Sequence, residues 1–210
     1  MHWDILDEKR RALLPLFRTF SDAGFYLAGG TGLALQLGHR DSIDFDFFKE
    51  GDFDTVALKK EIETVFAEHD VVFTQEEKNT LSCVVDGSVQ VSFFGFSYPL
   101  QVPLVQTEYF SIASFVDIGC MKLAAVTSRS VEKDYVDLYF ILQIISLADL
   151  ISLCREKYPS LDGALILKSL GYFDDVLREQ ILFKEGHTVA FEIVKEFLQK
   201  AIGRYFIRQR

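Results

Sequence analysis

The sequence predicts an α+β protein, with a mixed α/β first half and an all-helical second half. Three apolar β segments follow one another at residues 71–75, 80–85 and 88–94, and Asp86-Gly87 between the last two is a strong hairpin-turn signal. From Ser111 onward, apolar residues recur with helical spacing. We therefore place an α/β unit at residues 1–107 and a helical unit at 108–210.

The first half is expected to contain three helices and two further strands around a glycine-rich stretch. Residues 4–20 form an amphipathic helix that Pro15 kinks or breaks. A buried strand at 25–28 leads into a glycine turn at 29–32, a helix at 33–37 that Gly38 ends, and a strand at 43–48. A helix at 55–69 follows, capped by Asp52 or Asp54; its expected buried residues are Val56, Ile62, Val65 and Phe66.

Helical periodicity in the second half predicts helices at 114–128, 131–145, 147–158, 162–170, 173–183 and 187–208. On the last of these, Lys200, Arg204 and Arg208 recur every four residues. This stripe is either a solvated helix face or a surface for an RNA acceptor or an acidic partner.

Composition favours a cytoplasmic globular protein. The chain has 210 residues, 49% of them hydrophobic, but no apolar run of the roughly 20 residues that a membrane span requires. Its first residues lack the pattern of a signal peptide. Three scattered cysteines are expected to be reduced core residues. The net charge of −9 argues against extended wrapping of nucleic acid, although a local basic patch remains compatible with it.

The spacing of Asp44 and Asp46 indicates a metal site. Residues two apart on a strand share a face, so these carboxylates are expected to project together while Ile43, Phe45 and Phe47 face the core. Their Cα atoms would lie roughly 7 Å apart, a separation from which both side chains can bind one or two divalent ions. Without a cation, the two like charges beside apolar residues would repel each other.

The glycine turn supplies the complementary anion site. Gly29, Gly30 and Thr31 stand at the start of a short helix, where unpaired N–H groups face an incoming anion and glycine lets a phosphate approach. A phosphate cradle followed by a metal-binding acid pair predicts chemistry on a nucleoside triphosphate. The glycines taken alone would also fit a simple tight turn.

Two blocks of the sequence resemble a known family. Gly29, Gly30, Thr31, Arg40, Ser42, Asp44 and Asp46 resemble the first motif of the DNA polymerase β-like nucleotidyltransferases. The intervening LALQLGHR is most similar to the AbiEii/AbiGii toxins, the type IV toxin–antitoxin nucleotidyltransferases that include the MenT toxins. Lys122, Arg129, Asp134 and Asp137 resemble the later motifs of that family.

The resemblance implies a role for each motif residue. Asp44 and Asp46 would hold Mg²⁺, while Gly29, Gly30, Thr31, Arg40 and Ser42 would contact the nucleotide. Lys122 would bind the β- and γ-phosphates. Asp137 or Asp134 would accept a proton from the attacking hydroxyl, and Asp137, deeper in the helix, is the candidate we choose. Arg129 would either bind nucleotide or form an ion pair with Asp134 or Asp137. Apart from the resemblance, Asp134 at the start of its helix could simply complement the helix dipole.

The implied function is transfer of a nucleoside monophosphate from a triphosphate to an acceptor such as a tRNA 3′ end, by a toxin with a cognate antitoxin. One departure stands out. The third acid that polymerase β-like enzymes often carry on a later strand is missing, because residues 88–94 offer Gln90, Val91 or Ser92. Two alternatives stay open: a nucleotide-binding module without turnover, and a transferase acting on a small aminoglycoside-like molecule, which the acidic charge would attract.

Overall fold

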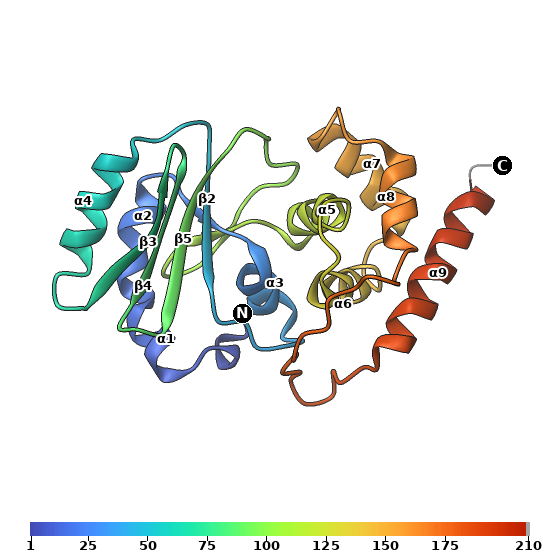
Figure 1. Cartoon of the computed structure of the whole chain (residues 1–210), viewed down its shortest axis with the longest axis horizontal. Helices are drawn as coiled ribbons and strands as arrows, with labels where there is room; N and C mark the ends of the chain where they lie inside the picture. Colours follow the sequence, from blue (N-terminus) through green and yellow to red (C-terminus); the bar gives the residue numbers. More distant parts are fainter. Residues whose placement is uncertain (209–210) are drawn as a thin grey trace. The chain divides into compact units, whose positions relative to one another are not determined.

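Residues 1–208 are described by a computed structural model, with the Arg208 side chain left out of the description (Figure 1). The chain divides into two compact units, Met1–Ser114 and Phe115–Arg210. The first unit ends later than the predicted boundary at 107/108 because the short strand at residues 111–112 belongs to its sheet. The predicted α+β class is confirmed: strands lie in the first unit, and the second is helical.

Within residues 1–208, seven strands form one mixed sheet in the order β3-β4-β5-β2-β1-β7-β6. The β3–β4–β5 meander is antiparallel, whereas β5 runs parallel to β2 and β1 runs parallel to β7. The strands are β1 (Tyr26–Leu27), β2 (Phe45–Glu50), β3 (Val71–Glu77), β4 (Thr80–Val85), β5 (Val89–Phe96), β6 (Val105–Gln106) and β7 (Ser111–Ile112).

An aromatic core holds one face of this sheet against its helices. Phe45 and Phe47 of β2 pack on Phe17, with ring centroids 4.6 and 5.1 Å apart. Phe93 of β5 packs on Phe20 at 4.9 Å. The helical segments are η1 (Trp3–Ile5), α1 (Glu8–Leu13), η2 (Leu14–Phe17), α2 (Arg18–Asp22), α3 (Gly29–Leu37) and α4 (Thr55–Val65). Because alternate residues of β2 enter this core, the side chain of Asp46 projects from the opposite face.

Local sequence signals fix several boundaries of the first unit. Pro15 lies in the 3₁₀ turn between α1 and α2, as the predicted break requires. Gly38 ends α3 with φ of +65°. Asp54 caps α4 by accepting hydrogen bonds from the N–H groups of Val56 and Ala57. Asp86 and Gly87 both have positive φ in the three-residue connection between β4 and β5, where the Ser88 N–H donates to the Val85 carbonyl oxygen and closes a tight turn.

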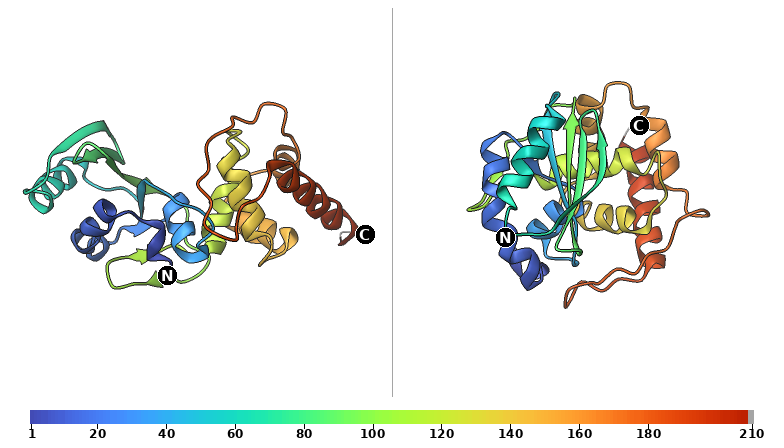
Figure 2. Two further views of the ribbon diagram at one scale, coloured as in Figure 1. Left: turned by 90° about the horizontal axis from the view of Figure 1, so that it is seen from below. Right: turned by 60° about the vertical axis from the view of Figure 1, so that its left-hand side comes forward.

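The second unit packs helices around α5 (Phe115–Ala125). Helix α6 (Glu132–Ile141) lies beside it, as Figures 1 and 2 show, and α7 (Leu147–Lys157) also packs on it. The other helices are α8 (Gly163–Leu170) and α9 (Phe191–Arg208). Every predicted helix of this half is present except the one at 173–183, where the chain is irregular.

Three further predictions about local structure were wrong. The glycines 29, 30 and 32 form the first turns of α3 and are not a turn before it. Val56 is exposed, because it follows the Asp54 cap on the outer side of α4. Residues 111–112 pair with β6 and β1 as β7 and are not helical.

No helix in the described part of the chain is long and apolar enough to cross a membrane. All three cysteines are buried and unbridged, as predicted. Burial raises the pKa of the Cys83 thiol to about 12.

Candidate active site

Asp46 lies on the sheet face opposite the aromatic core, next to a serine pair. Its partner in the parallel register between β2 and β5 is Ser92, and Ser92 pairs in turn with Ser82 of β4. The two serine hydroxyls are buried and 3.1 Å apart. Ser92 therefore occupies the strand position next to Asp46, the place where a third acid was missing from the sequence pattern. The pairing of β2 with β5 thus shows that the residue beside Asp46 is a serine and not an acid.

Asp44 does not share the strand with Asp46, contrary to the prediction of a strand at 43–48. Strand β2 begins at Phe45, and Ile43 is 57% exposed where a core-facing residue was expected. The physical reason lies in two side chains. The Thr31 hydroxyl donates to the carbonyl oxygen of Asp44, and Arg10 Nε donates to the carbonyl oxygen of Ile43 at 2.7 Å. Side-chain donors thus bind the backbone groups that a strand neighbour would otherwise pair.

The start of α3 is built for close approach to Asp46. Gly29 has φ of +61°, and a Cβ placed on it would lie 2.6 Å from Asp46 Oδ2. The helix N-cap is Ala28, whose side chain offers no acceptor to the first N–H groups of α3. Unpaired helix N-terminal N–H groups favour an anion. The Asp46 carboxylate and a helix start without a side-chain cap from its N-cap residue therefore lie side by side in the first unit.

Arg40 and Ser42 line the next glycine. A Cβ on Gly30 would lie 2.7 Å from Arg40 Nη2 and 3.0 Å from Ser42 Oγ. Arg40 is buried and donates through Nη1 to the carbonyl oxygen of Asp41 at 3.0 Å. The hydroxyls of Thr31 and Ser42 are 2.8 Å apart, so this pair fixes the loop before β2 onto α3. The predicted residues of the first motif thus come together in one place.

We expect Gly29→Ala to destabilise the first unit more than Gly87→Ala does. Both glycines have positive φ, so either alanine substitution lowers stability by about 1–2 kcal/mol through backbone strain. A Cβ at Gly87 would meet nothing within 4 Å, whereas one at Gly29 would collide with the Asp46 carboxylate. The collision adds about 1–3 kcal/mol. Urea unfolding of the two variants measures the difference, and equal losses would mean that Gly29 does not touch Asp46.

The later motif residues form a buried ion cluster in the second unit. Lys122 Nζ of α5 lies 2.7 Å from Asp134 Oδ1 and 2.7 Å from Asp137 Oδ2 of α6. Both aspartates are 0% exposed, and Lys122 is buried beside them. A lysine ammonium carries three N–H donors, so two of them bind carboxylates and one remains for another acceptor. The sequence patterns placed these residues on helix faces but did not reveal their mutual pairing.

Of the two predicted partners, Asp134 is the one that forms an ion pair with Arg129. Its Nε and Nη2 donate to the two carboxylate oxygens of Asp134 at 2.8 and 3.2 Å. The Arg129 side chain is 54% exposed, while Asp134 is fully buried. Asp134 therefore joins Lys122 to a partly exposed guanidinium. The interpretation of Asp134 as a helix-dipole complement was incomplete, because its carboxylate is the centre of these ion pairs.

A second buried ion pair lies on α5 and α7. Lys157 Nζ is 2.9 Å from Asp117 Oδ1, and both side chains are fully buried. Sequence reasoning missed this pair, because the two residues are 40 positions apart and only helix packing brings them together. Lys157 and Asp117 belong to neither family motif. The effect of removing Lys157 can therefore be compared with that of removing Lys122, to separate loss of a buried ion pair from loss of a functional group.

The family follows from comparison with known proteins. The sequence model of the family described as "Nucleotidyl transferase AbiEii toxin, Type IV TA system" matches residues 11–200. The chain belongs to this family. This AbiEii-family protein is also 36% identical over 204 residues to an uncharacterized protein of Aquifex aeolicus (strain VF5), aq_aa25, with 94% of this chain and 96% of the relative covered. It is therefore a nucleotidyltransferase-family toxin of a type IV toxin–antitoxin system.

Solved structures of low sequence identity share the fold. MenT4, a nucleotidyltransferase toxin of Mycobacterium tuberculosis, superposes with a TM-score of 0.64 at 15% identity, covering 93% of this chain and 82% of that one. JHP933 from Helicobacter pylori gives a TM-score of 0.58 at 16% identity, with 97% and 96% covered. The predicted polymerase β-like nucleotidyltransferase fold is thus confirmed for this AbiEii-family chain.

Proposed function

We propose that this AbiEii-family enzyme transfers a nucleoside monophosphate from a nucleoside triphosphate to an RNA acceptor, a tRNA 3′ end, in a Mg²⁺-dependent reaction. The observation that carries the proposal is the close approach between the start of α3, whose N-cap residue Ala28 supplies no side-chain acceptor, and the carboxylate of Asp46. An anion held at the helix start would lie beside a metal-binding acid. That combination suits a triphosphate accompanied by a divalent cation.

The residues around the glycines divide the nucleotide contacts. Gly29 and Gly30 leave room for a phosphate, and the N–H groups at the start of α3 would bind its oxygens. Arg40 lies against Gly30, where its guanidinium would neutralise phosphate charge. The hydroxyls of Thr31 and Ser42 bond within the fold, so we assign them the positioning of the loop that carries Asp44.

The acids fit magnesium by their chemistry. Mg²⁺ prefers oxygen ligands and takes one or two carboxylates together with substrate phosphates and water. Asp44 and Asp46 are carboxylates of this kind. No cluster of three or more His, Cys, Asp or Glu side chains suited to a metal occurs among residues 1–208, so triphosphate oxygens and water would complete the coordination. When bound, the ion supplies charge neutralisation at the phosphates.

The remaining roles rest on the family resemblance. An acceptor hydroxyl oxygen attacks the α-phosphorus, the new O–P bond forms, and the bond to pyrophosphate breaks. We assign acceptance of the hydroxyl proton to Asp137, because Ser92 occupies the strand position beside Asp46 and cannot serve as a carboxylate base. Lys122, with its third N–H donor, would contact the departing phosphates, and Arg129 would add positive charge near the nucleotide.

The family also implies the biological setting. Type IV toxin–antitoxin membership implies a cognate antitoxin as the functional partner and nucleoside triphosphate as the substrate. We place the protein in the cytoplasm, where triphosphates and tRNA are found. Modification of a tRNA 3′ end would arrest growth by blocking aminoacylation.

One observation favours a second acceptor class. Residues 1–114 carry 18 acidic and 9 basic side chains, whereas residues 115–210 carry 13 of each. The whole net charge of −9 therefore resides in the unit that contains Asp44 and Asp46. Such a field would attract a cationic small molecule of the aminoglycoside class.

Labelled transfer distinguishes the acceptors. The purified chain is incubated with Mg²⁺ and each α-labelled nucleoside triphosphate in turn, with total tRNA, a protein extract or kanamycin as acceptor. We expect label on tRNA, released as a terminal nucleotide by 3′ exonuclease. Label on kanamycin with none on tRNA would replace the RNA proposal by the small-molecule one. Label on protein alone would overturn both.

A further inference from the structure

We propose that the groove between α7 and α9 binds a single-stranded segment of the acceptor RNA. This inference rests on the proposed RNA acceptor and extends it to a second site. The groove consists of two adjoining cavities of about 440 and 430 Å³, which share Ala148 and Tyr205. The other lining residues used below are Leu142, Ile151, Arg155, Glu156, Phe197, Lys200, Arg204 and Ile207. We call this set the α7–α9 groove.

The charge of the groove fits a polyanion. Arg155, Lys200 and Arg204 contribute three cations, against one lining carboxylate, that of Glu156. Lys200 pairs loosely with Glu196 at 3.6 Å, and no ion pair engages Arg155 or Arg204 within the described part of the chain. The first unit carries nine more acidic than basic residues, so an RNA needs its cationic contacts elsewhere. The groove offers a local surplus of positive charge in the neutral second unit.

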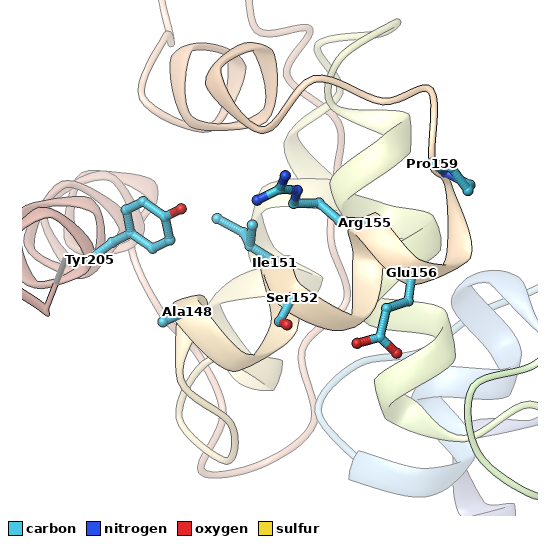
Figure 3. Close-up of a pocket in the computed structure, with 7 residues that line it drawn as sticks. All are labelled: Ala148, Ile151, Ser152, Arg155, Glu156, Pro159 and Tyr205. Carbon is cyan, nitrogen blue, oxygen red and sulfur yellow. The ribbon is translucent and has the colours of Figure 1, made fainter.

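Aromatic side chains lie among these cations. Tyr205 stands at the junction of the two cavities, and Phe197 lines the one that contains Lys200 and Arg204. In Figure 3 the Arg155 guanidinium and the Tyr205 ring point toward one another from α7 and α9, with Ile151 between them, whereas the Glu156 carboxylate points elsewhere. Bases stack on aromatic rings whatever their identity, and arginine adds cation–π contact and charge. Aromatic rings beside basic side chains are the combination that binds single strands.

The size and division of the groove also suit a single strand. Each cavity falls within the range of about 300–1,000 Å³ that is usual for small-molecule sites. Two such cavities on either side of Tyr205 would accommodate successive nucleotides, with the ring between their bases. The cations Arg155 and Arg204, one on each helix, would contact the backbone phosphates. A duplex presents no unstacked bases to such pockets, so we expect a preference for single strands.

The stripe predicted from the sequence enters this groove in part. Lys200 and Arg204 line it, and the Arg208 side chain lies outside the described residues. The interpretation of the stripe as a solvated face does not explain the aromatic and aliphatic residues beside it. Exposed Ile207 and the buried residue Leu142 give the same cavity an apolar wall. An amphipathic surface of this kind favours bases together with phosphates over simple counterions.

The test measures RNA binding directly, without nucleoside triphosphate. Fluorescence anisotropy of a labelled eight-nucleotide single-stranded RNA is followed with the wild type, with Arg155→Gln/Arg204→Gln, and with Lys168→Gln as the matched control. Lys168 is exposed in the same unit but does not line the groove. We expect the double variant to bind at least about tenfold more weakly. The slope of log K against log salt concentration should change from about −2.1 to about −0.7, because two of three phosphate contacts are removed.

Tyrosine variants separate stacking from folding. Tyr205→Phe keeps the ring and should bind RNA like the wild type, whereas Tyr205→Ala should lose about tenfold in affinity. Circular dichroism of both variants checks that α9 is intact, and a Tyr205→Leu variant that retains apolar packing should lose the same affinity. Equal affinity of the wild type and the charge variant would overturn the proposal. So would equal loss in the Lys168→Gln control, or binding of a poly-glutamate peptide in preference to RNA.

The outcome is separable from that of the proposed function. The Asp46→Asn protein should bind the RNA as the wild type does, because Asp46 is in the first unit and the groove is in the second. If the wild type transfers label to tRNA but binds single strands equally well without Arg155 and Arg204, only the groove assignment fails. If the charge variant loses RNA affinity while no acceptor is labelled, only the transferase proposal fails.

Discussion

Asp46→Asn is expected to lower nucleotidyl transfer by about a thousandfold while the protein stays folded. The carboxylate lies against Gly29 at the start of α3, where a Cβ would come within 2.6 Å of its Oδ2. Asparagine has nearly the same size but carries no negative charge, so it would hold a divalent cation poorly. Loss of one strong electrostatic contact to a transition state typically costs about 10²–10³ in rate, and loss of a metal ligand lies at the upper end.

The measurement is initial-rate transfer of labelled nucleotide to the acceptor found for the wild type. Asp70→Asn is the matched control, because Asp70 is an exposed aspartate of the same unit and lies outside the first motif. It should transfer at the wild-type rate. Circular dichroism should give the same melting curve for all three proteins to within a few degrees. Activity of Asp46→Asn above a tenth of the wild-type rate would show that this carboxylate does not bind the metal.

Lys122→Met is expected to lower both stability and activity, and the comparison with Lys157→Met separates the two effects. Removing Lys122 leaves Asp134 and Asp137, both fully buried, without the ammonium that lies 2.7 Å from each. Breaking a buried ion pair from one side typically costs about 3–5 kcal/mol. Arg129 still binds Asp134, so the loss of unfolding free energy should be about 3 kcal/mol, the lower end of this range.

Lys157→Met removes the ammonium 2.9 Å from the buried Asp117 and should destabilise by a similar amount. Urea unfolding measures both losses. Transfer is then assayed at a temperature where both variants are folded. We expect Lys157→Met to keep its activity per folded molecule, whereas Lys122→Met should lose about a hundredfold or more. Equal activity of the two variants would restrict Lys122 to a structural role. Wild-type stability of Lys122→Met would contradict the ion cluster itself.

Local chemistry explains why much of the fold could be predicted from the sequence. Gly38, Asp86 and Gly87 adopt positive φ, a conformation that few other residue types tolerate, so their positions indicate where a helix ends and where a hairpin turns. Pro15 breaks a helix because it lacks an N–H. The α/β and helical halves follow from periods of two and of 3.6 in the apolar residues. The prediction of a helix at 173–183 was wrong. Helical periodicity in the sequence does not ensure that the apolar face finds a packing partner, from which most helices gain their stability.

The sequence by itself determined the family, the fold class and the residues of the first motif, because glycine and aspartate at fixed spacing constrain the backbone directly. Tertiary structure decided three things that no local pattern contains. Thr31 and Arg10 bind the carbonyl oxygens of Asp44 and Ile43, so that β2 begins only after Asp44. The β2–β5 register placed Ser92 beside Asp46, and packing of α5 on α6 enclosed Lys122 between two carboxylates. Each of these depends on residues distant in sequence, whose contacts exist only after the chain has folded.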